Sequence, residues 1–271
     1  MADSKIVVFQ DKQIRRVWVD DDWYFSIVDI VGVLTGSPEP RKYWNKVKTR
    51  EFTDLQLSPI WRQLKLPAAD GKQYRTDCAT TQAMFRIIQS IPSPKAEPFK
   101  QWLAQERMKA IYEAKGYPKD WIDKRLRGIA IRQNLTDEWK ERGIREERDF
   151  AILTAEIARA TFGVTPSEHR AIKRLTKKGQ NLRDHMTDLE LIFTMLGERV
   201  TTEISQQEKP DTFAESKQVA RRGGNVAGVA RRETERELGH SVVSGQNFLD
   251  RNPDGLIEDT IGLPPLDSEK E

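Results

Sequence analysis

The sequence predicts an α+β fold, in which N-terminal antiparallel strands with helices precede an all-helical C-terminal domain and a disordered tail. Three observations carry this prediction. Short β-rich runs bounded by polar turns occupy the first 25 residues and residues 60–78, whereas helical periodicity dominates residues 116–249. Residues 250–271 combine prolines and glycines with seven acidic side chains, a composition that cannot contribute to a core. We therefore expect domains at 1–115 and 116–249, followed by an acidic flexible tail at 250–271.

The charge of the chain is distributed unevenly. Its 271 residues include 45 Lys and Arg against 42 Asp and Glu, a net charge of +3. Residues 1–115 carry a net charge of +5 and residues 116–249 one of +3, whereas the tail carries −5. The near-neutral total is therefore a poor guide to partners, because a basic N-terminal half is offset by an acidic end.

Residue usage argues against several classes of site. A single cysteine, Cys78, excludes a disulfide framework and a cysteine zinc site, and three scattered histidines cannot supply the missing ligands. No apolar stretch reaches the length of a signal peptide or a membrane span. We therefore expect a cytoplasmic protein with no metal, no cofactor and no membrane contact.

The first strands are expected at Lys5–Phe9, Gln13–Val19 and Trp23–Phe25, joined by short polar turns into an antiparallel meander. The second turn is the triplet at 20–22, three consecutive aspartates. A cation site is the alternative for this triplet, but the further ligands of a calcium loop are missing at the required spacing.

Helical spacing begins after Ser26, which can cap a helix whose apolar stripe ends before Gly36. A second short helix is expected at 41–50, with Tyr43, Trp44 and Val47 on one face. Two short helices joined by a tight turn are how helix-turn-helix proteins present a DNA-reading helix.

The helix at 41–50 carries five basic and no acidic residues. Lys and Arg neutralise phosphates, and Asn can pair with an adenine edge, so this surface suits nucleic acid; a merely solvated basic face is the alternative. The candidate DNA-binding residues on this helix are Arg41, Lys42, Asn45, Lys46, Lys48, Thr49 and Arg50.

Residues 60–66 and 73–78 are expected to form a β-hairpin around Asp70-Gly71. We expect its polar face to carry Arg62, Lys72 and Arg75 and to act as a basic wing. Cys78 ends the second run with no histidine nearby, which indicates a buried inert thiol rather than a nucleophile.

Two further helices follow the hairpin. Thr80 or Thr81 can cap the first, and Ser93-Pro94 opens the second. The apolar stripe of the second helix shifts by about two positions after Leu103, so we expect a helix end or kink near Gln105.

Three blocks in the N-terminal half, residues 23–34 (WYFSIVDIVGVL), 74–77 (YRTD) and 93–103 (SPKAEPFKQWL), resemble the Bro-N domain. This is the N-terminal DNA-binding module of baculovirus Bro proteins and many phage antirepressors. Residues 146–154 (EERDFAILT) and 178–191 (KGQNLRDHMTDLEL) look like the helical half of bacterial DNA-damage-inducible protein D. The resemblance implies a small α+β DNA-binding fold, a prophage or DNA-damage-response setting, and a repressor or recombinase as protein partner.

The C-terminal half shows helical stripes but no catalytic constellation. Residues 189–204 form the longest expected stripe, and Thr136 is expected to cap a separate helix. His169 and His185 stand between charged neighbours and are expected to be solvated or capping side chains rather than ligands. The glycines of 222–228 lack the Lys-Ser/Thr of a phosphate loop and follow no strand.

Paired arginines flank this glycine-rich stretch, which is expected to be flexible. The alternatives are a solvated helix-loop-helix and a second contact with nucleic acid or protein, because arginines beside glycines can approach a phosphate backbone. The candidate residues for a second contact are Arg221, Arg222, Arg231 and Arg232.

These observations favour a DNA-binding regulatory protein that is not an enzyme. Its N-terminal domain would contact duplex DNA, and its helical domain would mediate homo-oligomer assembly or partner binding. The alternative is a protein-interaction module that binds a recombinase or repressor with little DNA binding of its own. A nuclease is disfavoured, because no Asp/Glu/Lys or His cluster has a recognisable spacing.

Overall fold

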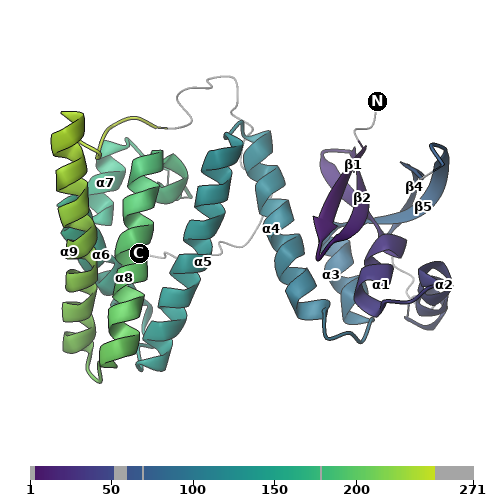
Figure 1. Cartoon of the computed structure of the whole chain (residues 1–271), viewed down its shortest axis with the longest axis horizontal. Coiled ribbons are helices and arrows are strands. Elements are labelled where there is room, and N and C mark those ends of the chain that lie inside the picture. The colour runs from purple at the N-terminus through teal and green to yellow at the C-terminus, as the bar shows by residue number, and fades with distance from the viewer. Residues whose placement is uncertain (1–3, 52–59, 69, 178, 248–271) are drawn as a thin grey trace. The chain divides into compact units, whose positions relative to one another are not determined.

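The computed structural model describes residues 4–51, 60–68, 70–177 and 179–247 (Figure 1). The chain divides into two compact units, residues 1–108 and 109–271. Each unit is built around its own core, and each is described separately below.

The N-terminal unit contains a five-stranded antiparallel sheet with the strand order β1-β2-β3-β5-β4 (Figure 1). The strands are β1 (Ser4–Phe9), β2 (Lys12–Val19), β3 (Asp22–Ser26), β4 (Arg62–Pro67) and β5 (Gln73–Thr80). The expected meander of the first three strands and the expected β4–β5 hairpin are both confirmed.

Two-residue turns connect the meander. Gln10 and Asp11 have φ angles of 45° and 63°, and Asp20 and Asp21 have 50° and 59°. Two successive residues with positive φ are the signature of the hairpin turn whose twist matches that of the flanking strands. Aspartate tolerates this left-handed region better than most side chains, so backbone geometry accounts for the aspartates at the second turn.

Four helices accompany the sheet: α1 (Ile27–Thr35), α2 (Pro40–Glu51), α3 (Thr81–Gln89) and α4 (Ala96–Ala114). The Ser26 hydroxyl accepts a hydrogen bond from the Asp29 amide, and Gly36 ends α1 in the left-handed conformation. Thr80 caps α3 in the same way as Ser26 caps α1. The expected helix starts and the α1 stop are therefore confirmed.

The sheet is curled, and both of its faces are packed. Phe9 of β1 lies 5.0 Å, ring centre to ring centre, from Phe99 of α4, which places α4 on one face. The other face holds the buried cluster of Val17, Tyr24, Leu66 and Cys78. A hydrogen bond of 3.2 Å from the Arg15 side chain to the Pro67 carbonyl joins strands β2 and β4, although they are not neighbours in the sheet.

The expected helix end near Gln105 is wrong, because α4 continues to Ala114, whereas a kink there stays a prediction. The apolar pattern nevertheless shifts for a physical reason. Phe99 and Leu103 are buried in the first unit, whereas Tyr112 belongs to the second unit and hydrogen-bonds Asp184 there. One helix thus contributes different faces to two cores, and its stripe changes phase without a break.

The described part of the C-terminal unit is helical, as expected. Its elements are α5 (Lys119–Glu141), α6 (Glu147–Phe162), α7 (Pro166–Ile172), the short 3-10 helix η1 (Leu182–His185), α8 (Asp188–Glu208) and α9 (Phe213–Leu238). Helix α9 packs against both α6 and α8, and α5 packs against α8 (Figure 1). The expected helix start at Thr136 is wrong: Thr136 lies inside α5 and donates to the Arg132 carbonyl at 2.9 Å.

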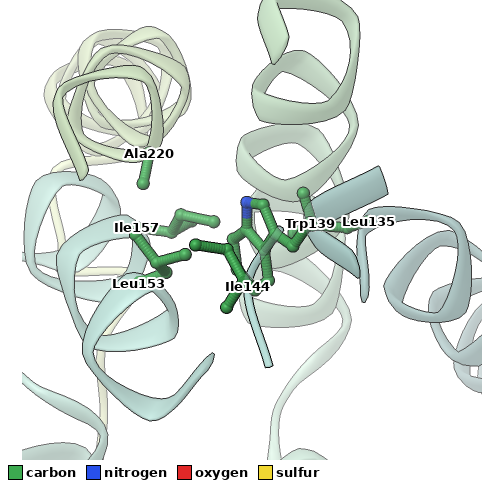
Figure 2. Close-up of a cluster of buried hydrophobic side chains, with 6 residues drawn as sticks. All are labelled: Leu135, Trp139, Ile144, Leu153, Ile157 and Ala220. Carbon is green, nitrogen blue, oxygen red and sulfur yellow. The ribbon is translucent and has the colours of Figure 1, made fainter. Parts of the chain in front are cut away.

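A cluster of apolar side chains ties α5, α6 and α9 together (Figure 2). Trp139 at its centre is flanked by side chains from the loop after α5, from α6 and from α9. The members of the cluster are Leu135, Trp139, Ile144, Leu153, Ile157 and Ala220.

The glycine-rich stretch at 222–228 is neither flexible nor a loop, which corrects the expectation from the sequence. It lies within the continuous helix α9. A Cβ on Gly223 would stand 2.6 Å from the Thr201 nitrogen of α8, and one on Gly224 would stand 2.6 Å from the Ile157 carbonyl oxygen of α6. The glycines therefore permit backbone-to-backbone packing on two sides of α9.

The expected stripe along α8 is confirmed in part. Phe193 is buried, and Leu189 and Leu196 pack against its cluster. Ile192, however, is 40% exposed, whereas Gly197, Thr201 and Ser205 are buried. Small side chains line the α9 side of α8 because large ones would hold the two backbones apart.

Candidate nucleic-acid interface

Helix α2 presents one buried and one exposed face. Trp44 and Val47 are buried. The opposite face is exposed, as the periodicity predicts, and it carries Arg41, Lys42, Asn45, Lys46, Thr49 and Arg50. A row of basic and amide side chains therefore projects from a helix that is held by its apolar side.

Asp77 of β5 fixes this helix to the hairpin. Its Oδ2 accepts hydrogen bonds from Trp44 Nε1 at 2.8 Å and from Lys48 Nζ at 2.7 Å, and its Oδ1 accepts one from Gln63 Nε2 at 3.3 Å. Burial alone would raise the pKa of the Asp77 carboxyl, but the bonds from Lys48, Trp44 and Gln63 outweigh burial and hold the pKa below its usual value. The carboxylate is thus charged at neutral pH and sets the position of α2.

Lys48 is consequently separated from the other cations of α2. Its side chain is only 28% exposed and is engaged with Asp77. The structure gives it a positioning role within the domain, in contrast to the exposed Lys42 and Lys46.

The strand register decides which hairpin cations lie on the α2 side. Residues directly opposite each other in a ladder share a face, and so do residues two apart in one strand. Gln63 pairs with Asp77, so the α2 side of the hairpin also carries the next pair, Lys65 and Arg75. Both side chains are exposed.

Arg62 lies on the other face of the hairpin, so the expectation of one polar face with Arg62 and Arg75 is wrong. Arg62 pairs with Cys78, and its guanidinium lies 2.6 Å from Asp20 and above the Tyr24 ring. Successive side chains of a strand point to opposite faces of the sheet. Because Gln63 lies on the α2 side, its neighbour Arg62 must lie on the other face.

Lys65 was not among the candidate DNA-binding residues predicted from the sequence, although the alignment of the two strands about their turn could have identified it. If Asp70 is taken as the centre of the turn, the two runs can be aligned, and position 65 then falls opposite Arg75. Counting charged residues in each run separately hides this pairing.

Lys72 lies at the tip of the hairpin. The turn is closed by a hydrogen bond of 2.9 Å from the Ala68 amide to the Lys72 carbonyl, and Gly71 has a φ of 77° that favours glycine. The Asp70 carboxylate accepts bonds from the Lys72 amide and the Tyr74 hydroxyl. The Lys72 side chain is exposed.

Some exposed cations of α2 also have surface partners. Lys42 lies 2.5 Å from Glu39, and Arg50 lies 2.6 Å from Glu51. Exposed ion pairs of this kind contribute about 0–1 kcal/mol. They do not prevent these side chains from turning toward a phosphate.

The four arginines expected to form a second contact are not equivalent. Arg231 is largely covered and donates to the Thr161 carbonyl at 2.8 Å, so it joins α9 to the end of α6. Arg221 and Arg222 are exposed and lie beside Glu156 and Glu208, respectively. Arg232 is exposed as well.

Both histidines that the sequence assigned to solvated or capping positions are buried, which corrects that expectation. His169 Nε2 lies 2.9 Å from Glu190 Oε1, and Lys173 Nζ lies 2.6 Å from Glu190 Oε2, all three side chains being enclosed. Burial acts to raise the pKa of Glu190, but the bonds from His169 and Lys173 outweigh it and lower the pKa. His185 Nδ1 lies 2.9 Å from the Asn247 side-chain oxygen.

In the described ranges, no group of three or more His, Cys, Asp or Glu side chains could hold a metal ion. No helix in the same part of the chain is long and apolar enough to cross a membrane.

Comparison with known families decides the nature of the N-terminal unit. Residues 13–109 match the family described as the BRO family, N-terminal domain. This region is a Bro-N domain. The match includes both α2 and the β4–β5 hairpin, so the exposed basic residues of the Bro-N domain lie inside it. The resemblance of residues 146–154 and 178–191 to DNA-damage-inducible protein D lies outside this match and stays an expectation. No curated protein matches the chain.

Proposed function

We propose that this chain is a DNA-binding regulatory protein whose Bro-N domain contacts duplex DNA through α2 and the β4–β5 hairpin. The observation that carries the proposal is the arrangement around Asp77. This carboxylate holds α2 against the same hairpin face that carries Lys65 and Arg75. The exposed cations of the helix and of the hairpin thereby belong to one side of the domain.

The chemistry of this surface suits a duplex. An α-helix fits the major groove, where an amide such as Asn45 can pair with an adenine edge. Lysine and arginine neutralise phosphates and release counterions, which supplies affinity that depends on salt. The short connection between α1 and α2, from Gly36 to Glu39, is of the length found in helix-turn-helix motifs.

The likeness to phage antirepressors and to DNA-damage-inducible protein D supports a regulatory role in a prophage or DNA-damage setting. Under this proposal the N-terminal domain (1–115) supplies the DNA contact and the helical domain (116–249) mediates assembly or binds a partner such as a repressor or recombinase. Cytoplasmic localisation and the absence of catalytic activity are parts of the same proposal.

The test is a salt titration of duplex binding with a matched pair of charge changes. The variant Lys42→Gln/Lys46→Gln removes two exposed cations from α2, and Lys12→Gln/Lys95→Gln removes two exposed lysines from other parts of the domain. Each lost phosphate contact lowers the slope of log affinity against log salt by about 0.9, so the α2 variant should lose about 1.8. The control should keep the slope of the unmodified protein. Equal slopes for both variants would remove α2 from the interface.

A further inference from the structure

Exposed basic residues of α9 in the C-terminal unit lie at 217–222 and again at 232, with Asn225, Val226 and Val229 exposed between them. Residues 216–232 include five Lys and Arg and no acidic residue, and the flanking positions are Glu215 and Glu233. The buried side of the same stretch is formed mostly by small residues, and four of the five cations lie away from it, whereas Arg231 is largely covered. Arg221, Arg222 and Arg232 are exposed, as is Asn225 between them.

A shallow groove of about 420 Å³ lies between this surface and α6. Its lining comprises Glu156, Arg159 and Ala160 of α6 and Arg221, Arg222 and Asn225 of α9. The groove exists because the two helices approach closely. A Cβ on Gly224 would stand 2.9 Å from the Ala160 Cβ. With only small side chains at the closest approach, arginines border the groove on both sides.

Cations outnumber anions at this groove. Glu156 is the acidic residue of the lining, and it accepts bonds from Arg221 Nε and Nη2 at 3.2 Å each and lies 3.2 Å from Lys217 Nζ. Arg159 adds a third cation; it has no salt-bridge contact within 4.0 Å among the described residues, although its charge helps to lower the pKa of the exposed Glu168 carboxyl. Arg222 is balanced by Glu208 at 2.7 Å. The groove therefore keeps an excess positive charge.

Arg221 is available despite its contact with Glu156. Its side chain is 68% exposed, and one carboxylate is shared between Arg221 and Lys217. Glu156 engages the Nε and Nη2 groups of Arg221, so the other edge of the exposed guanidinium can donate to a second acceptor such as a phosphate, in a charge-assisted hydrogen bond. If Arg221 turns away, Lys217 still neutralises Glu156.

The extent of the basic surface favours a polymer over a single small anion. At a rise of about 1.5 Å per residue, Arg221 and Arg232 are separated by roughly 16 Å along α9. This length corresponds to about five nucleotides of one strand of a duplex, at about 3.4 Å each. The groove is open along its length, whereas sites for small ligands usually enclose most of the ligand surface.

We propose that the α6–α9 groove, with Arg159 and Arg221 on its two sides, is a second nucleic-acid contact that binds the phosphate backbone of duplex DNA. The contact is independent of the Bro-N surface, because every residue that forms it belongs to the C-terminal unit. It recognises phosphodiesters and not base sequence, because flexible exposed arginines on an open groove contact backbone oxygens.

The experiment measures binding of the full chain to a labelled random-sequence duplex across a salt series. The groove variant is Arg159→Gln/Arg221→Gln. Its matched control is Arg127→Gln/Arg199→Gln, which also removes two exposed arginines, one of them paired with a glutamate, from other helices of the same unit. The groove variant should lower the log–log slope by about 1.8, and the control should leave it unchanged. Equal effects of the two variants overturn the proposal.

The single variant Arg159→Gln tests the groove with less risk that the protein fails to fold. Arg159→Gln breaks no ion pair among the described residues and should alone lower the slope by about 0.9. An unchanged slope for this variant also overturns the proposal. Inorganic phosphate, added at constant ionic strength, provides the second arm: displacement of the duplex at low millimolar phosphate would assign the groove to a free anion and contradict a polymer contact.

Combining the groove variant with Lys42→Gln/Lys46→Gln separates this inference from the proposed function. Additive losses of slope support both contacts. A loss with the α2 variant alone overturns the groove and leaves the Bro-N surface, whereas a loss with the groove variant alone does the reverse.

Discussion

Replacing Gly223 with alanine tests the backbone-to-backbone packing of α9 against α8. The new Cβ would lie 2.6 Å from the Thr201 nitrogen and 2.7 Å from its Cα, and it would also overlap the Thr201 hydroxyl. Optimal contacts between such atoms are about 3.5–4.0 Å, so the two helices must separate by roughly 1 Å. Overpacking of this kind costs about 1–3 kcal/mol, and the separation also weakens the contacts of neighbouring buried residues.

The same substitution raises the helix propensity of α9, and this gain offsets part of the steric cost. Alanine is favoured over glycine in a helix by about 1 kcal/mol. Because the obstacle is backbone rather than a flexible side chain, we expect the steric cost to prevail and the free energy of unfolding to fall by about 1–2 kcal/mol. Chemical denaturation of the full chain, followed by circular dichroism, measures this difference.

Gly128 in α5 provides the matched control. A Cβ at this position would meet only the Met195 side chain, at 3.5 Å, which is an ordinary contact. Gly128→Ala should therefore be neutral or stabilise the protein by up to about 1 kcal/mol. If Gly223→Ala is as stable as Gly128→Ala, the argument for close helix approach is refuted.

Two predictions concern buried carboxylates. The pKa of Asp77 is lower in the folded chain than in the unfolded one, so its stabilising effect is complete above the unfolded value near 3.9 and is lost as pH falls through the lower folded pKa. Asp77→Asn should thus lower the unfolding free energy at pH 7. The difference in unfolding free energy between this variant and the unmodified chain should shrink toward pH 2. A difference that does not change with pH would contradict this prediction. Glu190→Gln should lower the unfolding free energy by about 3–5 kcal/mol, because it leaves the enclosed Lys173 without its counter-charge. Urea denaturation measures the loss, and the double variant Glu190→Leu/Lys173→Met should recover much of it; a loss below 1 kcal/mol for the single variant would argue against the buried pair.

The N-terminal unit was largely predictable because its signals are local. Turn residues, the caps Ser26 and Thr80 and the stop at Gly36 each act within a few positions of the chain. The strands alternate clearly, and the hairpin turn contains its own glycine. These local signals agree with the final fold, so they are sufficient to predict the meander, the hairpin and the helices.

The C-terminal unit was less predictable because its packing depends on partners distant in sequence. Glycine lowers helix propensity and suggests a break, yet Gly223 and Gly224 lie within one helix. What stabilises them there is contact with Thr201 and Ile157, which no local pattern reveals. The burial of His169 follows in the same way from Glu190, 21 positions away.

The candidate interface was predictable in part for a related reason. Helical periodicity alone separates the exposed cations of α2 from Trp44 and Val47. The division of the hairpin cations between two faces requires the strand register, and the engagement of Lys48 requires its tertiary partner Asp77. Charge counting therefore finds the helix but cannot distinguish a positioning lysine from an exposed one.

The close packing of α9 has a consequence for how such helices diverge in evolution. Gly223, Gly224 and Gly228 each face backbone atoms of another helix, so no larger residue fits without moving that helix. Exposed positions such as Arg222 and Val229 carry no such constraint from the fold. Distant relatives of the helical half should thus share the spacing of these glycines even where their surface charges differ, and that spacing offers a more durable search pattern than the arginines beside it.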